Sequence, residues 1–189
     1  MIYSLNEIPD VINDFICREH FHLIIRGDVH TGKSTYVQKL LSTYPFLTPY
    51  GFYTKKSIGE KGIHDGLYIH SASIKSENRF YNEHNRIALI SQGCSYKEIN
   101  TDIFDTVGVQ LLSENNIKHN SVAIADEVGF LEGNAFCFLN AVKACFTSDK
   151  SVIAVFKNKS IPYLDDMLNI KGNMTVNVLP DFKFKITCL

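Results

Sequence analysis

This chain's fold is decided by one stretch, Gly27-Asp28-Val29-His30-Thr31-Gly32-Lys33-Ser34, with Thr35 as the next residue. The stretch matches the pattern GxxxxGK[ST] at every fixed position. A short apolar run over residues 21–26 precedes it and predicts a buried strand, and apolar side chains recur at helical spacing over residues 37–44. Since the motif requires a strand before it and a helix after it, the sequence predicts a phosphate-binding P-loop over residues 27–35.

The residue types of this loop suit the binding of a nucleoside triphosphate. Phosphate oxygens need several backbone N–H donors at once, and Gly27 and Gly32 leave the backbone open to close approach. Lys33 is predicted to bring its charge to the β and γ phosphates, and the Ser34 hydroxyl suits Mg²⁺. The following helix adds its positive N-terminal end. Residues 27–35 therefore form the predicted nucleotide site, with Lys33 as a catalytic group and Ser34 as a metal ligand.

An acidic pair follows a second apolar run, Val122-Ala-Ile-Ala-Asp126-Glu127. A Mg²⁺ ion that bridges phosphates needs a carboxylate at the tip of a strand near the loop, and Asp126 is predicted to supply it. Glu127 would then activate the attacking water as a general base. The alternative is that the pair is a solvated turn after a buried strand.

Strand-like and helix-like segments alternate over much of the chain, which predicts an α/β fold with three layers. We expect a P-loop fold with a mostly parallel central sheet and helices on both faces, in one domain over residues 1–189. A β-rich insertion is expected over about residues 50–96, with a hairpin bend near Gly59-Glu-Lys-Gly62. The apolar run over residues 151–155 is expected to lie between the P-loop strand and the acidic strand.

The composition narrows the choice of partners. The chain has 189 residues, of which 45% are hydrophobic and 21% charged, and its net charge is −1. This balance disfavours a general nucleic-acid or anionic-membrane surface, so we expect a small molecule as partner. Five cysteines show no CxxC pair, and no stretch reaches the roughly 18 apolar residues of a membrane span. We therefore expect a cytoplasmic protein without a membrane segment; the oligomeric state is left open.

Two segments, Gly51-Phe-Tyr-Thr54 and Asp126-Glu-Val-Gly-Phe-Leu-Glu132, extend the P-loop into a longer pattern. In this order the pattern resembles the small cancer-related nucleoside-triphosphatase family, first known from thermophiles, over most of the chain. The resemblance implies a RecA-like core and Mg²⁺-dependent hydrolysis of nucleoside triphosphates with broad base tolerance. It also nominates Glu132 as a catalytic residue, since it matches the second acidic position of the family.

The chain departs from that family where arginines are expected. After the GFYT segment it has Lys55-Lys56-Ser-Ile58, and only four arginines occur in the whole sequence. Arg79 and Arg86, in the insertion, are candidates to reach a γ phosphate. Lys55, Lys56 and Lys61 could replace an arginine as point charges, although lysine lacks the planar fork of arginine.

Hydrolysis of a nucleoside triphosphate, ATP or GTP, is the function that these patterns favour. Water activated by Glu127 would attack the γ phosphorus of a triphosphate bound with Mg²⁺. Two alternatives stay open: a nucleotide or small-molecule kinase, and a slow nucleotide-dependent switch.

Overall fold

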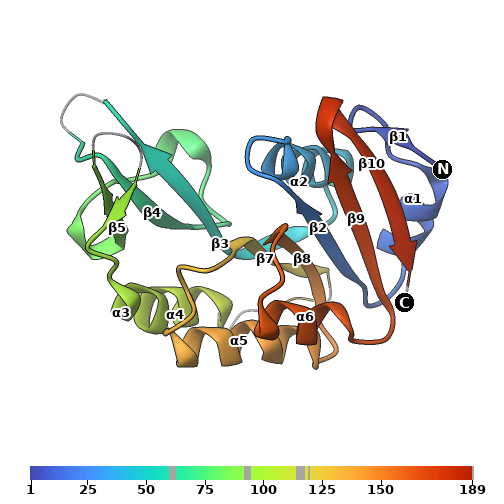
Figure 1. Cartoon of the computed structure of the whole chain (residues 1–189). Helices are drawn as coiled ribbons and strands as arrows, with labels where there is room; N and C mark the ends of the chain where they lie inside the picture. The colour runs from blue at the N-terminus through green and yellow to red at the C-terminus, as the bar shows by residue number, and fades with distance from the viewer. Residues whose placement is uncertain (60–62, 92–94, 114–117, 119, 189) are drawn as a thin grey trace.

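The structure is a computed structural model that describes the chain except for residues 60–62, 92–94, 114–117, 119 and 189. A ten-stranded sheet runs through the molecule in the order β1-β10-β9-β2-β8-β7-β3-β4-β5-β6 (Figure 1). The first half of the chain contains β1 (Tyr3–Ser4), α1 (Asp10–Ile16), β2 (His22–Gly27), α2 (Lys33–Thr43), β3 (Thr48–Ser57), β4 (Gly66–Ser71), β5 (Arg86–Ile90) and β6 (Tyr96–Lys97).

The second half begins with α3 (Thr101–Ile103), a π-helical turn (Phe104–Gly108) and α4 (Val109–Leu112), which together form one continuous helix. It continues with β7 (Ser121–Val128), α5 (Phe136–Phe146), β8 (Ser151–Lys157), α6 (Pro162–Leu168), β9 (Asn173–Leu179) and β10 (Lys183–Cys188). Short 3₁₀ turns lie at Ser76–Asn78, Glu83–Asn85 and Pro180–Phe182.

The centre of the sheet is parallel, as expected for an α/β protein. Strands β9, β2, β8, β7 and β3 pair parallel to one another. Strand β8 lies between the P-loop strand β2 and the acidic strand β7, so the predicted insertion of residues 151–155 is confirmed. The carboxyl ends of β2, β8 and β7 therefore meet at one edge of the sheet, where such folds bind ligands.

The prediction of a mostly parallel sheet is wrong for the two flanks, and the sheet is mixed. Strands β10 and β1 pair antiparallel beyond β9, and β4, β5 and β6 pair antiparallel beyond β3. Short connections explain the pairs β9–β10, β3–β4 and β5–β6, because a parallel return needs a crossover of a dozen residues or more. The turn Pro180–Phe182 directly joins β9 to β10. The predicted bend at residues 59–62 falls largely outside the described residues.

Helices cover both faces of the sheet, which confirms the layered α/β arrangement (Figure 1). Helices α1 and α2 pack on one face and α3 to α6 on the other. The strands supply both cores by alternation: in β2, Leu23 and Ile25 face α2, whereas Ile24 faces the α5 side. These buried side chains hold β2 and α2, and thus the loop between them, in a fixed position.

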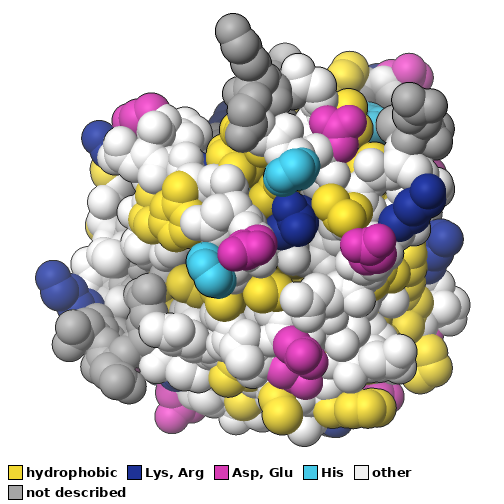
Figure 2. Space-filling view, turned by 90° about the vertical axis from the view of Figure 1, so that its left-hand side faces the viewer, with side chains coloured by type: hydrophobic (Ala, Val, Ile, Leu, Met, Phe, Trp, Pro, Cys, Tyr) yellow, Lys and Arg dark blue, Asp and Glu magenta, His cyan; other side chains and the backbone are white. Residues whose placement is uncertain are grey.

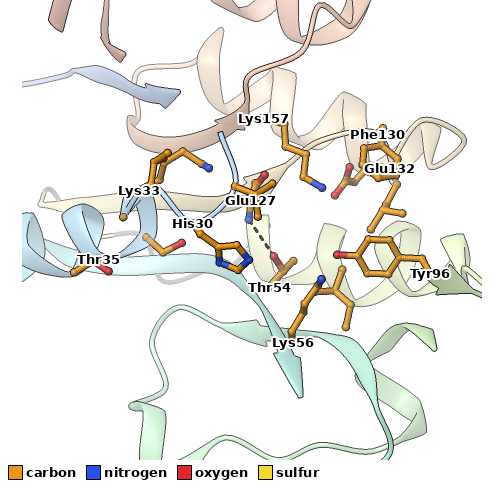
Figure 3. Close-up of a pocket in the computed structure, with 16 residues that line it drawn as sticks. His30, Lys33, Thr35, Thr54, Lys56, Tyr96, Glu127, Phe130, Glu132 and Lys157 are labelled. Atoms are coloured by element: carbon orange, nitrogen blue, oxygen red, sulfur yellow. Dashed lines mark hydrogen bonds between the residues drawn. The ribbon is translucent and has the colours of Figure 1, made fainter. Parts of the chain in front are cut away.

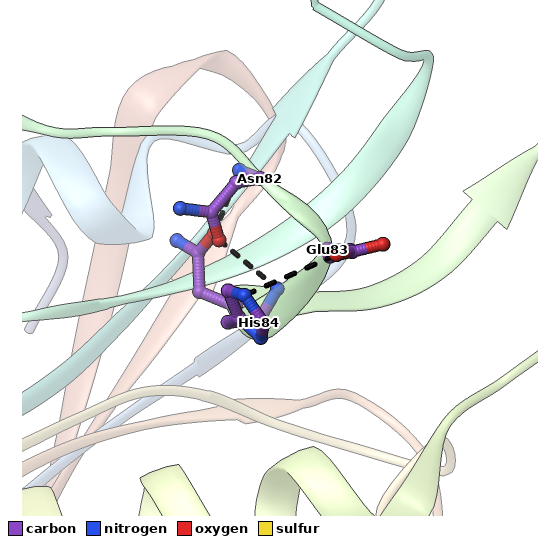
Figure 4. Close-up of polar contacts among 4 residues, drawn as sticks. Asn82, Glu83 and His84 are labelled. Carbon is purple, nitrogen blue, oxygen red and sulfur yellow. Dashed lines mark hydrogen bonds and ion pairs between the residues drawn. The ribbon is translucent and has the colours of Figure 1, made fainter.

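The segment between β4 and β5 is pinned by asparagines (Figure 4). The Asn82 side chain accepts a hydrogen bond from the backbone N–H of His84 at 3.0 Å, and the Asn85 side chain accepts one from the N–H of Asn82 at 3.0 Å. Asn85 also donates to the carbonyls of Ile69, at 2.9 Å, and Phe80, at 3.0 Å. These bonds tie the connecting segment back to the hairpin strand β4.

The face of the molecule that carries β4 and β5 has charges of both signs. Acidic, basic and histidine side chains are interspersed there with small hydrophobic areas (Figure 2). A mixed surface of this kind does not create the single-sign field that would attract a polyanion.

Candidate active site

A cleft of about 480 Å³ opens at the edge where the parallel strands end (Figure 3). Three parts of the chain line it: the P-loop (Val29, His30, Thr31, Gly32, Lys33, Ser34 and Thr35), the insertion (Thr54, Lys56, Leu67 and Tyr96), and the ends of β7 and β8 with the loop after β7 (Glu127, Phe130, Leu131, Glu132 and Lys157). The predicted residues Gly27, Asp28 and Asp126 are not among the residues that line it.

The two P-loop glycines are required by the backbone and its packing. Gly32 has φ of +91°, which favours glycine, and it precedes the first turn of α2. A Cβ on Gly27 would lie 2.9 Å from the carbonyl oxygen of Val178 in β9. The loop thus leaves β2 in close contact with β9 and turns its backbone toward the cleft.

Lys33 is held within the loop by a local hydrogen bond. Its side chain is buried, and its Nζ donates to the backbone carbonyl of Asp28 at 2.7 Å. The hydroxyl of Thr31 donates to the same carbonyl at 2.8 Å, and the Asp28 carboxylate accepts from Asn158 at 3.1 Å. These contacts curl the loop around the position where phosphate oxygens would meet N–H groups.

Ser34 and Asp126 meet although 92 residues separate them in the sequence. The Ser34 hydroxyl donates to Oδ1 of Asp126 at 3.0 Å, and Asp126 is only 2% exposed. Burial raises the pKa of Asp126 to about 6, while the hydrogen bond from Ser34 opposes the rise. No cluster of three His, Cys, Asp or Glu side chains suited to a metal occurs in the described part of the chain. A hydroxyl beside one carboxylate nevertheless fits Mg²⁺, which takes few protein ligands and completes its shell with phosphates and water.

Glu127 follows Asp126 but points into the cleft. Its backbone N–H donates to Oγ1 of Thr54 at 3.3 Å, which ties the end of β7 to β3. Its Oε1 is buried and has no hydrogen-bond partner among the described residues. An acceptor in this condition is costly unless a ligand or water completes it. In Figure 3 it lies between the P-loop residues Lys33 and Thr35 and the residues Glu132, Phe130 and Tyr96.

Glu132 is more deeply enclosed than Glu127. It is 3% exposed, and its Oε2 accepts the backbone N–H of Gly129 at 2.9 Å. Burial raises the pKa of Glu132 to about 7, against the opposing effects of this hydrogen bond and of Lys157. The carboxyl group therefore fixes the turn that carries Phe130 to the rim of the cleft.

Lys157 is a functional candidate that sequence reasoning missed. It ends β8, and its Nζ lies 4.3 Å from the centre of the Phe130 ring. A Cβ on Gly129 would lie 2.7 Å from Cδ of Lys157, so the glycine leaves room for the lysine stem. A usable signal was present: the apolar run of β8 ends in a lysine, and the ends of neighbouring parallel strands share an edge.

Of the cationic residues that were expected to replace the missing arginine, some line the cleft and others do not. Lys56 lines the cleft, with its Nζ 5.1 Å from the centre of the Tyr96 ring. Arg79 and Arg86, the arginine candidates, do not line it, and neither does Lys55. Lys55 lies elsewhere because β3 is pleated: Thr54 and Lys56 face the cleft, whereas Tyr53 and Lys55 face away from it. Lys61 lies outside the described residues.

The fold and this site define a P-loop α/β protein with a nucleotide cleft at the edge of its sheet. A family model described as NTPase matches residues 22–185, and the chain belongs to this family of nucleoside-triphosphate hydrolases. Nucleoside-triphosphatase THEP1 of Thermotoga petrophila is 28% identical over 150 residues, which are 79% of this chain and 79% of that protein. The resemblance found in the sequence is thereby confirmed.

Two solved structures share the fold. The crystal structure of THEP1 from Aquifex aeolicus has a TM-score of 0.61 at 20% identity, over 85% of this chain and 91% of that one. The solution structure of a human cancer-related nucleoside triphosphatase has a TM-score of 0.62 at 18% identity, over 85% of this chain and 90% of that one. Within the described residues, none of the helices is both long and apolar enough to cross a membrane.

Proposed function

We propose that this chain hydrolyses nucleoside triphosphates in a Mg²⁺-dependent reaction, with Glu127 as the general base. The observation that carries the proposal is that Glu127 lines the cleft beside the P-loop and that its Oε1, which is buried, has no hydrogen-bond partner among the described residues. A base must reach the water that it deprotonates, and a carboxylate oxygen that is not engaged by the described residues can accept that proton.

The proposed reaction follows from the position of each group. Residues 27–35 bind the phosphates through backbone N–H groups, and Lys33 exchanges the Asp28 carbonyl for β and γ oxygens. A water between Glu127 and the γ phosphorus attacks that phosphorus and gives its proton to the Glu127 carboxylate. The bond from the γ phosphorus to the bridging oxygen breaks, which releases a nucleoside diphosphate and inorganic phosphate.

Ser34 and Asp126 would hold the Mg²⁺ ion, Ser34 through its hydroxyl and Asp126 directly or through a water. When bound, the ion would neutralise charge on the β and γ oxygens. The short contact between the two side chains supports this assignment, because a single ion can be reached by both.

Lys157 is proposed to supply the positive charge that an arginine supplies in related enzymes. None of the four arginines, all of which the structure describes, lines the cleft. In Figure 3 Lys157 lies on the side of Glu127 away from Lys33; it packs on Phe130, its charge acts on Glu132, and it forms no ion pair within 4.0 Å among the described residues. Its flexible stem allows the ammonium to move onto the γ phosphate as charge develops.

Glu132 is proposed to act as a positioning residue. Its carboxyl group contacts the backbone of Gly129 and thereby orients Phe130 and, through the ring, Lys157. We further propose broad tolerance of the base, ATP and GTP included, because the P-loop contacts only phosphates. The chain is proposed to work as one domain, since a single sheet joins β1 to the insertion.

Phosphate release without any added acceptor tests the proposal. ATP or GTP incubated with the protein and Mg²⁺ should yield inorganic phosphate and the diphosphate in equal amounts. Chelation of the metal should abolish the release, and Lys33→Ala, purified in the same way, serves as the blank for contaminating phosphatases. If the parent releases no more phosphate than this variant does, hydrolysis at the P-loop is refuted.

A phosphoryl transferase is the second candidate, and one observation favours it. The cleft continues past Glu127 to Leu67, Tyr96 and Phe130, so it offers room for an organic acceptor beyond a water. This candidate predicts slow phosphate release by the protein alone and faster loss of triphosphate when an acceptor is present. A slow switch predicts tight triphosphate binding with single-turnover hydrolysis only over many minutes.

A further inference from the structure

A second cavity of about 510 Å³ lies on the opposite face of the β3–β4 hairpin from the nucleotide cleft. It is bounded by α2, by β3 and by the segment that follows β4. The pleat of β3 separates the two cavities, because Lys56 lines the nucleotide cleft and its neighbour Lys55 lines the second cavity. The second cavity is thus distinct from the P-loop site.

The lining of this cavity is positively charged. Lys55, Lys75 and Arg79 contribute cations, and the lining contains no aspartate or glutamate among the described residues. None of the three cations forms an ion pair in the described part of the chain. Lys75 interacts with the exposed Glu77 and Lys55 with Asp126, but three cations around one hollow still create a local field that attracts an anion, even in a chain whose net charge is −1.

Arg79 is held in place but incompletely bonded. Its guanidinium lies 5.3 Å from the centre of the buried Tyr53 ring, and its Nε is buried without a partner among the described residues. The neighbouring His70 reflects the same field: burial first, and then Arg79 and Lys55, lower the pKa of His70 to about 4. Arg79 lines the cavity, and its planar guanidinium fork suits an oxyanion that can accept two hydrogen bonds.

The cavity is also organised before any ligand arrives. The bonds of Asn82 and Asn85 pin the segment after β4, and the hydroxyls of Ser71 and Ser73 lie 2.7 Å apart at its start. Ser73 adds a hydroxyl to the rim, whereas the Ser76 hydroxyl donates to the Glu77 carboxylate at 3.3 Å. The loop that carries Lys75 and Arg79 would therefore lose little conformational entropy when a ligand binds.

We propose that this second cavity binds the phosphate group of a small phosphate monoester. The charge of a phosphate dianion suits three cations better than the charge of a single carboxylate does, and the Ser73 hydroxyl can supply a further donor. Leu41, Pro49 and Ile74 form an apolar wall that can take the carbon part of such a molecule. The volume lies within the range of small-molecule pockets. The inference does not depend on the proposed hydrolysis.

Amide and arginine Nε–H NMR spectra of the full chain, titrated with inorganic phosphate and with phenyl phosphate, test this proposal. We expect saturable shifts at the Ser73 and Ser76 amides and at the Arg79 Nε–H, with phenyl phosphate binding more tightly because its ring meets the apolar wall. Shifts confined to residues 27–35 would assign the binding to the P-loop and overturn the proposal.

Matched variants complete the experiment. Arg79→Gln should weaken phosphate binding at this site about tenfold, the usual scale for one charge-assisted contact. Arg86→Gln, an arginine of the same insertion outside the cavity, should leave it unchanged. If Arg79→Gln disturbs folding, Lys75→Gln, an exposed position, should still weaken binding. Equal affinity in Lys75→Gln and the parent, or equal losses in Arg79→Gln and Arg86→Gln, would refute the site.

Discussion

The two walls of the nucleotide cleft are built on different principles. The P-loop wall, residues 27–35, consists of consecutive residues whose contacts are mostly local, such as Lys33 to the Asp28 carbonyl. The opposite wall, made of Lys56, Tyr96, Phe130, Glu132 and Lys157, draws its side chains from separate strands and loops. The first wall provides chemistry common to phosphate binding. The second is proposed to act at the γ phosphate, and it rests on long-range packing.

Glu127 stands between the two walls, and its replacement should give the largest effect. Glu127→Gln keeps size and hydrogen bonding but cannot accept a proton, so hydrolysis should fall by roughly 10²- to 10⁴-fold. Affinity for Mg²⁺ and triphosphate should hardly change. Single-turnover phosphate release beside calorimetric titration measures both quantities.

The neighbouring carboxylate supplies the control for that experiment. Asp126→Asn should weaken Mg²⁺-dependent triphosphate binding and turnover together, because Asp126 is assigned to the metal. If Glu127→Gln retains hydrolysis within about threefold of the parent, well short of the general-base range, the base has to be sought on the opposite wall, at Glu132.

Glu132 should make the stability of the opposite wall depend on pH. Its folded-state pKa of about 7 lies above the ordinary value of 4.5, so the folded state holds the proton more tightly than the unfolded state. Stability should then fall as pH rises from about 4.5 to 7 and level off above. A shift of this size corresponds to about 3 kcal/mol.

Glu132→Gln removes this titration. The free energy of unfolding is measured with denaturant at pH 5 and pH 8, without metal or nucleotide. At pH 8, relative to pH 5, Glu132→Gln should gain most of the shift of about 3 kcal/mol over the parent. Glu83→Gln, at an exposed position away from the cleft, should follow the parent at both values. Parallel pH profiles for the parent and Glu132→Gln would contradict the buried carboxyl.

Lys157 and Lys159 offer a matched pair on the opposite wall. Both ammonium groups lie over the Phe130 ring, at 4.3 Å and 5.2 Å, but only Lys157 lines the cleft. Lys157→Ala should lower kcat about tenfold to a hundredfold. This decrease is smaller than the one caused by removing a fully enclosed donor, because Lys157 is half-buried. Lys157→Arg should restore part of it. Lys159→Ala should leave kcat near the parent value; equal losses would show that only general charge matters.

The smallest effect is expected from exchanging the nucleobase of the substrate. Since the P-loop wall is proposed to contact phosphates only, kcat/KM for ATP and GTP should agree within about tenfold, or 1.4 kcal/mol. Steady-state assays with both triphosphates measure the ratio. A preference beyond about a hundredfold would reveal a contact that distinguishes the nucleobases. The rings of Tyr96 and Phe130 on the opposite wall would then be the candidates for that contact.

The sequence by itself determined the P-loop wall, the acidic strand and the family. Gly27, Gly32 and Lys33 stand at fixed spacing because consecutive backbone groups form the predicted phosphate-binding loop. A short sequence motif can predict such local geometry. The order of strands around β8 also followed, since buried parallel strands are nearly continuous apolar runs.

Only the tertiary structure decided the opposite wall and the antiparallel flanks of the sheet. Lys157 meets Phe130 and Glu132 because parallel strands end at one edge, and Lys55 turns away from the cleft because a pleated strand alternates its side chains. Strand β10 pairs with β9 through a short turn that carries little apolar pattern. Contacts of this kind depend on which segments pack together in the fold, and residue spacing along the chain does not predict that packing.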